Sequence, residues 1–139
     1  MKVTQTLRKL LAGSSIALAA LSVSAQTTKV TLSGSQEVPP VTTAATGSGT
    51  ITVSGDGSIS GSVTTNGVEA TMAHIHEAPL GKNGPVIITF DRTASNVWSI
   101  PAGTKLSAAQ LKSFKSGNLY VNVHSALNKD GEIRGQLRP

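Results

Sequence analysis

Three histidines are the residues of this sequence best suited to carry chemistry. They are His74, His76 and His124, and the 139-residue chain has no other histidine and no cysteine. Neutral imidazole nitrogens bind copper and zinc, whereas a chain without cysteine has no thiolate metal site and no thiol nucleophile. Binding of a transition metal is therefore the first chemistry to consider.

The spacing of the first two histidines favours a shared ion. His74 and His76 flank Ile75 in a predicted strand, so both rings lie on one face, roughly 7 Å apart along the chain. A third imidazole from another strand, His124, would complete a trigonal or open tetrahedral set for copper or, as the second choice, zinc. Met72 shares this face and is a candidate auxiliary ligand for reduced copper. The spacing leaves open whether His124 meets the pair, because it does not give the order of the strands.

Two other roles for the histidines stay open at this point. The rings can instead be polar strand residues that hydrogen-bond to neighbouring loops and hold the fold together. They can also be contacts for a protein or glycan partner. The positions of the ring nitrogens test the metal hypothesis against both, because nitrogens more than about 6 Å apart could not share one ion.

The elements that must position these residues are short strands. Period-two alternation bounded by Gly, Pro and Asn predicts strands at 29–33, 51–53, 59–63, 68–77, 86–90, 97–100, 119–124 and 132–137. The dipeptide Asn66-Gly67 predicts a two-residue hairpin. One helix is predicted at 108–116, with Ser107 and Gln110 forming a capping box and Gly117 ending it. About seven strands with hairpin spacing are typical of an antiparallel β-sandwich.

The last two predicted strands pair across a turn at Asp130-Gly131 and have two distinct faces. One face is apolar: Leu119, Val121, Val123, Ile133, Gly135 and Leu137. The other is polar: Tyr120, Asn122, His124, Glu132, Arg134 and Gln136. Because opposed residues share a face, His124 is expected to neighbour Glu132 or Arg134. Both are candidates to support the metal ligands, Glu132 by orienting the ring of His124, and the two are expected to form an ion pair.

Two further charged positions are expected to be structural. Glu37, next to Pro39 and Pro40, is interpreted as a charge on an edge strand. Asp91-Arg92 is interpreted as a solvated pair in a turn.

The beginning of the chain resembles a secretory signal peptide over residues 1–25, which leaves one domain at 26–139. Lys2, Arg8 and Lys9 precede an apolar stretch, and Val23-Ser24-Ala25 fits a cleavage site after Ala25. An uncleaved membrane anchor is the alternative, but the apolar stretch is too short for a stable membrane span. Without the leader the net charge falls from +5 to +2, with nine scattered basic and seven acidic residues. This excludes nucleic acid as a partner and predicts a periplasmic or secreted protein.

Four blocks of the remaining sequence resemble the chordin-type (CHRD) domain. They are LSGSQEVPPV at 32–41, AHIHEAP at 73–79 with NGPV at 83–86, LYVNVHS at 119–125 and GEIRGQL at 131–137. The resemblance implies an extracytoplasmic β-domain of the kind found in bacterial exported proteins and in the animal protein chordin. All three histidines fall within these blocks.

A second, local resemblance concerns the histidine strands. His74-Ile-His76-Glu77 is similar to the strand that supplies two copper ligands in copper–zinc superoxide dismutases, and Val121-Asn-Val-His124 to the strand that supplies another. Arg134, on the last predicted strand, resembles the arginine that guides the substrate in these enzymes. The bridging histidine, the zinc ligands and the disulfide have no counterparts in this chain. The resemblance implies a three-histidine copper-like site and an all-β, Greek-key β-sandwich that is immunoglobulin-like or superoxide-dismutase-like, with one short helix added.

Together these observations predict an exported binding module rather than an enzyme. Its function would be to sequester or deliver a copper ion, or zinc, on His74, His76 and His124. The alternative is an extracellular interaction or adhesion domain with structural histidines and another extracytoplasmic protein as its partner. A superoxide-dismutase-like redox enzyme is the third hypothesis.

Overall fold

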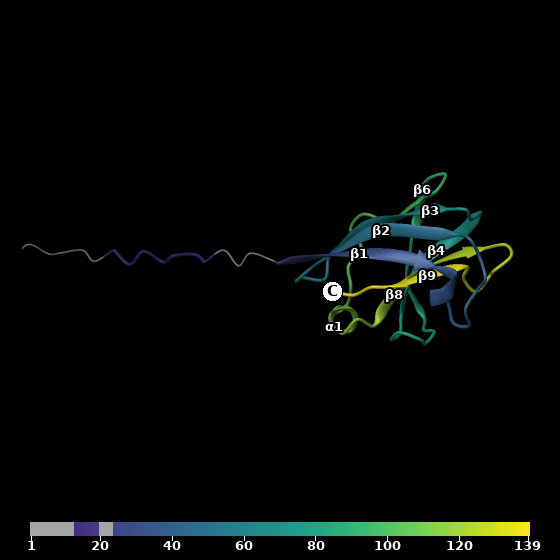
Figure 1. The fold of residues 1–139 in the computed structure, drawn as a ribbon. Helices are drawn as coiled ribbons and strands as arrows, with labels where there is room; N and C mark the ends of the chain where they lie inside the picture. Colours follow the sequence, from purple (N-terminus) through teal and green to yellow (C-terminus); the bar gives the residue numbers. More distant parts are fainter. Residues whose placement is uncertain (1–12, 20–23) are drawn as a thin grey trace, which may run out of the picture.

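The computed structural model describes residues 13–19 and 24–139 (Figure 1). Most of the predicted leader, at 1–12 and 20–23, therefore lies outside the described residues. Residues 13–19 are exposed and belong to no helix or strand. Within the described ranges, no helix has the length and apolar character needed to cross a membrane.

The described chain forms nine strands, one 3-10 helix and one α-helix. In order they are β1 (Ala25–Ser33), η1 (Gly34–Gln36), β2 (Thr46–Ser54), β3 (Ile59–Asn66), β4 (Ala70–Glu77), β5 (Val86–Thr89), β6 (Asp91–Ala94), β7 (Val97–Ser99), α1 (Ala108–Lys115), β8 (Leu119–Ser125) and β9 (Ile133–Gln136). The strands form one sheet in the order β5-β4-β8-β9-β1-β2-β3-β7-β6, and every ladder between neighbours is antiparallel. The predicted antiparallel β-sandwich with one short helix is confirmed.

The sheet bends so that its two halves enclose one hydrophobic core (Figure 1). Leu32, Ile51 and Val63 on β1, β2 and β3 are fully buried, as are Ile75 on β4 and Val121 on β8. These side chains alternate with polar residues along their strands, which is why a single face of each strand supplies the core. Burial of this apolar surface is the main source of stability for the fold.

Two local predictions are confirmed in detail. The register of β8 with β9 pairs Val121 with Gly135 and Asn122 with Arg134, which gives the two predicted faces. At α1 the Ser107 hydroxyl accepts from the Gln110 amide at 3.1 Å, and the Gln110 side chain accepts from the Ser107 amide at 2.9 Å. The helix ends at Lys115, one residue earlier than predicted, because Ser116 is its C-cap.

Two other predictions are wrong. Asn66-Gly67 does not join a hairpin, because β3 pairs with β2 and β7 while β4 pairs with β5 and β8. The dipeptide forms a local turn, with Gly67 at φ +71°. The strand that follows, β4, pairs with β5 and β8 instead of folding back on β3. Asp91-Arg92 is not a solvated turn but the start of β6, an exposed edge strand that the period-two pattern does not reveal.

The polar face of β8 and β9 is buried, although its side chains are polar or charged. Every residue of both strands is buried, because the connection from β4 to β5 lies across this face. Arg134 donates to the carbonyl of Lys82 at 2.8 Å, and Gln136 donates to that of Ala78 at 2.9 Å. The segment after η1 joins this cover: Glu37 is only 6% exposed, so its interpretation as an edge-strand charge is wrong.

Candidate metal centre

The pairing of β4 with β8 brings the three histidines together. In this register Met72 lies opposite His124, His74 opposite Asn122, and His76 opposite Tyr120. All of these side chains belong to one face, and His124 is diagonal to His74. Diagonal neighbours in a sheet lie close enough for long or aromatic side chains to touch, so β8 places its imidazole beside the pair on β4.

The three imidazoles lie within the span of one metal ion. One nitrogen from each of His74, His76 and His124 can be chosen so that all three lie within 4.8 Å of one another. His74 Nδ1 is 3.0 Å from His124 Nε2. Two nitrogens bound to one tetrahedral metal at about 2.0 Å are separated by about 3.3 Å. Small rotations of the rings would therefore allow all three to bind the same ion.

Backbone carbonyls fix the tautomers of two rings. His76 Nδ1 is 2.9 Å from the carbonyl oxygen of Gly84, and His124 Nδ1 is 2.7 Å from that of Lys129. A carbonyl only accepts, so Nδ1 carries the proton in both neutral rings and each Nε2 keeps its lone pair. The Nε2 of His76 is buried and has no hydrogen-bond partner in the part of the chain that the structure describes. Such second contacts orient imidazoles in metal sites.

The electrostatic environment of His74 and His76 favours their neutral form. Burial, with smaller contributions from His124 and His76, lowers the pKa of His74 to about 4. Burial also lowers the pKa of His76 below its ordinary value. Metal binding requires the neutral form, so these two rings need not lose a proton to bind an ion at neutral pH.

Tyr120 and Arg134 stack in turn on the ring of His76. The ring of Tyr120 is stacked on that of His76 with centroids 4.8 Å apart, and the Arg134 guanidinium lies 3.5 Å above the Tyr120 ring. Arg134 is fully buried and donates to Lys82 O and to Asn83 Oδ1. It thereby holds the same β4–β5 connection whose Gly84 carbonyl orients His76.

The predicted supporting residues take different places. Met72 lies across from His124 but is 46% exposed, and a bulge between Ala70 and Met72 interrupts the expected alternation of 68–77. The Glu132 carboxylate accepts from Asn128 Nδ2 at 2.9 Å, and the Lys129 carbonyl, rather than Glu132, holds the ring of His124. Glu132 and Arg134 form no ion pair in the described ranges, where the one pair joins Lys105 to Asp56.

Sequence reasoning missed several groups around the histidines. The carbonyls of Gly84 and Lys129 belong to the backbone and leave no signal in side-chain type. The place of Asn122 could have been predicted from the sequence, because it lies two residues before His124 and so shares its strand face. Its Oδ1 is 3.0 Å from His124 Nε2.

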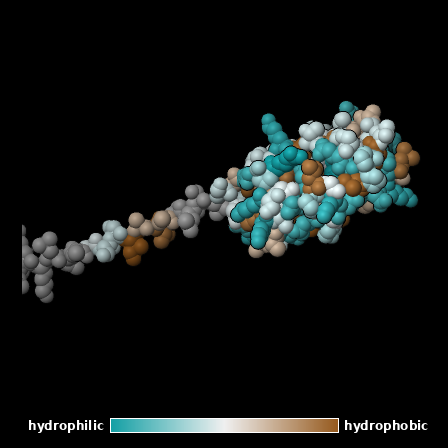
Figure 2. All heavy atoms as spheres, turned by 60° about the horizontal axis from the view of Figure 1, so that its bottom comes forward, coloured by the Kyte–Doolittle hydropathy of each residue, from teal (hydrophilic) through white to brown (hydrophobic). Residues whose placement is uncertain are grey.

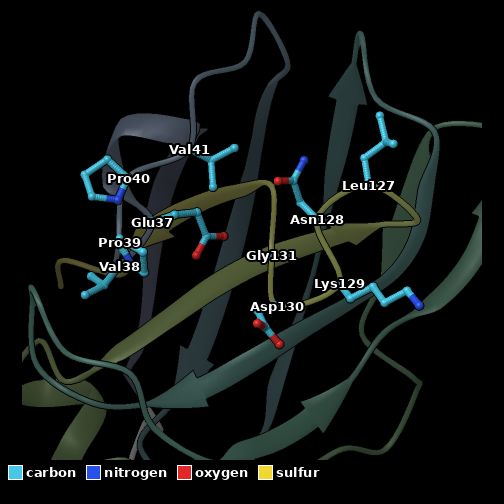
Figure 3. Close-up of a pocket in the computed structure, with 10 residues that line it drawn as sticks. All are labelled: Glu37, Val38, Pro39, Pro40, Val41, Leu127, Asn128, Lys129, Asp130 and Gly131. Carbon is cyan, nitrogen blue, oxygen red and sulfur yellow. The ribbon is translucent and has the colours of Figure 1, made fainter.

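A pocket of about 260 Å³ adjoins the centre, between the segment after η1 and the loop from Leu127 to Gly131 (Figure 3). Glu37 points from the first wall toward Gly131, and burial raises the pKa of its carboxyl to about 7. Its Oε1 has no hydrogen-bond partner among the described residues. The second wall carries Lys129, so the pocket and the metal centre share one loop.

Comparison with known proteins gives one match. A family model described as the CHRD domain matches residues 28–137, which include all three histidines. No curated protein and no solved structure matches the chain.

Proposed function

The chain belongs to the CHRD domain family, and on this premise we propose that it is an extracytoplasmic module that binds a transition-metal ion. The ligands are His74, His76 and His124. Copper is the first choice of ion and zinc the second, because imidazole suits both. The module would sequester the ion or deliver it to another protein.

One observation carries this proposal. The unprotonated Nε2 atoms of His76 and His124 belong to one cluster of three histidines, and the Nε2 of His76 has no hydrogen-bond partner in the described residues. The Nε2 of His76 is buried without a partner in the described residues, which costs free energy in the metal-free protein. A structural histidine would be expected to use both nitrogens. An ion bound by His76, His74 and His124 would satisfy the orphaned atom.

The alternative is an interaction domain in which the histidines only hold the fold together. The contact of His74 Nδ1 with His124 Nε2 favours it, because that contact needs no ion. On the face shown in Figure 2, however, hydrophobic side chains lie in small groups between hydrophilic ones. Protein interaction sites are usually marked by larger exposed apolar patches, so this face gives the alternative little support.

The proposal is tested by metal titration of protein purified without a histidine tag. We expect wild type to bind one Cu²⁺ or Zn²⁺ ion per chain with a dissociation constant below about 1 μM, the range of specific binding. His76→Phe keeps an aromatic ring against Tyr120 but removes the ligand, and should lower the affinity by at least about 100-fold. Asp56→Asn, in the β2–β3 turn, is the control and should bind as wild type does.

Two outcomes would contradict the proposal. Wild type that binds neither ion more tightly than about 1 μM has no specific site. Equal binding by wild type and His76→Phe would show that the ion sits elsewhere. Copper binding without redox turnover would exclude the enzyme hypothesis while leaving the binding module in place.

A further inference from the structure

We infer that the side-chain oxygen of Asn122 is a fourth ligand of this ion and that the centre is built for divalent metals rather than for Cu⁺. The inference rests on the proposed function, since it concerns the same site. No residue type in the sequence marks Asn122 as a ligand, and its role follows from the geometry of its amide.

The amide oxygen of Asn122 lies beside the imidazole of His124. Asn122 is 2% exposed and lies opposite His74 in the register of β4 with β8. Its Oδ1 is 3.0 Å from His124 Nε2, the same distance that separates that nitrogen from His74 Nδ1. The oxygen therefore lies as close to one of the three ligand nitrogens as a second ligand nitrogen does.

The contact between Asn122 and His124 is unfavourable without a cation. Because Lys129 O holds the proton of His124 on Nδ1, the neutral ring presents a lone pair at Nε2, which faces both His74 Nδ1 and Asn122 Oδ1. The amide Oδ1 also only accepts. Two buried acceptors 3.0 Å apart repel each other, and a metal ion bound to both would turn this repulsion into coordination.

The opposite end of the amide fixes its orientation. Asn122 Nδ2 donates to the carbonyl of Asp130 at 3.3 Å, and Glu37 Oε1 lies beside the same glycine as this nitrogen. A methyl group at Gly131 would collide with both Glu37 Oε1 and Asn122 Nδ2, so this glycine lets the two groups meet, and Figure 3 shows Glu37 pointing toward it. A flipped amide would turn its oxygen toward the Asp130 carbonyl and the Glu37 carboxyl. Oδ1 is thus held toward the histidines.

This donor set discriminates between ions. Three imidazoles and one amide oxygen suit Cu²⁺ and Zn²⁺, whereas Cu⁺ prefers soft sulfur donors and gains little from an oxygen ligand. Met72, the sulfur donor nearest in register, is half exposed across from His124. Removal of the amide oxygen should therefore weaken the divalent ions selectively.

The test compares the affinities of wild type, Asn122→Ala and the control Asn96→Ala for Cu²⁺, Zn²⁺ and Cu⁺. Asn96 also donates to a backbone carbonyl, that of Thr65, but lies between β6 and β7. We expect Asn122→Ala to lose about 10- to 100-fold in affinity for Cu²⁺ and Zn²⁺, as when partners of a metal site are removed. Its Cu⁺ affinity should change by less than about 3-fold, which also shows that the variant is folded. Asn96→Ala should match wild type for all three ions.

A second measurement uses wild type alone and does not depend on the folding of a variant. One equivalent of Zn²⁺ should shift the ¹³C resonance of the Asn122 carboxamide together with the histidine resonances. Unchanged Asn122 resonances beside shifted histidines, or an equal loss of all three ions in Asn122→Ala, would overturn the inference and leave the three-histidine site standing. Wild type that binds no ion would instead overturn the proposed function.

Discussion

The orphaned Nε2 of His76 is the atom on which the functional argument depends. Its ring is fixed from two sides, by the Gly84 carbonyl at Nδ1 and by the stacked ring of Tyr120. Burial would favour pairing of the second nitrogen as well, yet that nitrogen faces the other histidines without a partner in the described residues. A metal ligand must be held in place and must keep a free lone pair until the ion binds, and the ring of His76 meets both requirements.

Arg134 is the residue that holds this orientation, and its replacement tests that role. We expect Arg134→Met to lower the free energy of unfolding by about 3 kcal/mol or more. The substitution leaves buried carbonyl oxygens without their hydrogen-bond donor and removes the positive charge near Glu37. Metal affinity should fall as well, since the β4–β5 connection would no longer be fixed. Urea unfolding and metal titration measure the two effects.

The matched control is Arg92→Met. Arg92 is exposed on β6 and lies 5.5 Å from the centroid of the Trp98 ring, so its loss should cost about 1 kcal/mol or less. Equal effects of the two substitutions would contradict the role given to Arg134.

Among the elements, the β4–β8 ladder creates the centre and was the part least predictable from the sequence. The β8–β9 register follows from a short turn and two alternating faces, so its pairs could be predicted residue by residue. The β4–β8 pairing joins segments about fifty residues apart, as with His74 and His124, and local signals do not report such contacts. The failed hairpin at Asn66-Gly67 has the same cause, because the dipeptide fixes a turn and not a partner.

The β4–β5 connection is the second element that the centre needs, and Gly84 is its tightest point. A Cβ at Gly84 would collide with the carbonyl of Glu77. We expect Gly84→Ala to displace the carbonyl that orients His76 and to lower both the thermal unfolding midpoint and the metal affinity, with differential scanning calorimetry and titration as the measurements.

Gly81, in the same connection, provides the comparison. A Cβ there meets no described atom within 4 Å, although φ is +80°, so Gly81→Ala should cost about 1–2 kcal/mol of backbone strain and leave metal affinity unchanged. Metal affinities that fall equally in both variants would contradict the role of the Gly84 carbonyl.

In the molecule as a whole, the centre is a polar layer enclosed between the sheet and two connections. The three histidines are 7–8% exposed, so a bound ion would be largely shielded from solvent, as suits sequestration. The same enclosure holds Glu37, His74 and His76 in environments that disfavour charge. The stability of the whole fold should therefore depend on pH in two opposite ways.

His74 and Glu37 change the stability of the fold with opposite dependence on pH. With a pKa near 4 in the folded state, His74 binds fewer protons than in the unfolded chain, so stability is lost as pH falls from about 6.5 toward 4. With a pKa near 7, against 4.5 when exposed, Glu37 binds more protons in the folded state, so stability is lost as pH rises through that range.

Glu37→Gln separates the two contributions. We expect the free energy of unfolding of this variant, relative to wild type, to rise between pH 4.5 and 7, because the glutamine side chain cannot ionise. Urea unfolding across this range measures the difference. Parallel pH profiles for the two proteins would show that Glu37 is not held in the environment described.

The most direct test of the central claim is a long-range ¹H–¹⁵N spectrum of the imidazoles before and after one equivalent of Zn²⁺. The chain has only three histidines, so every ring can be followed. We predict Nδ1-protonated tautomers for His76 and His124 in the metal-free protein. Zinc should then shift the resonances of all three rings. Nε2-protonated rings at His76 and His124, or a spectrum that zinc leaves unchanged, would contradict the account.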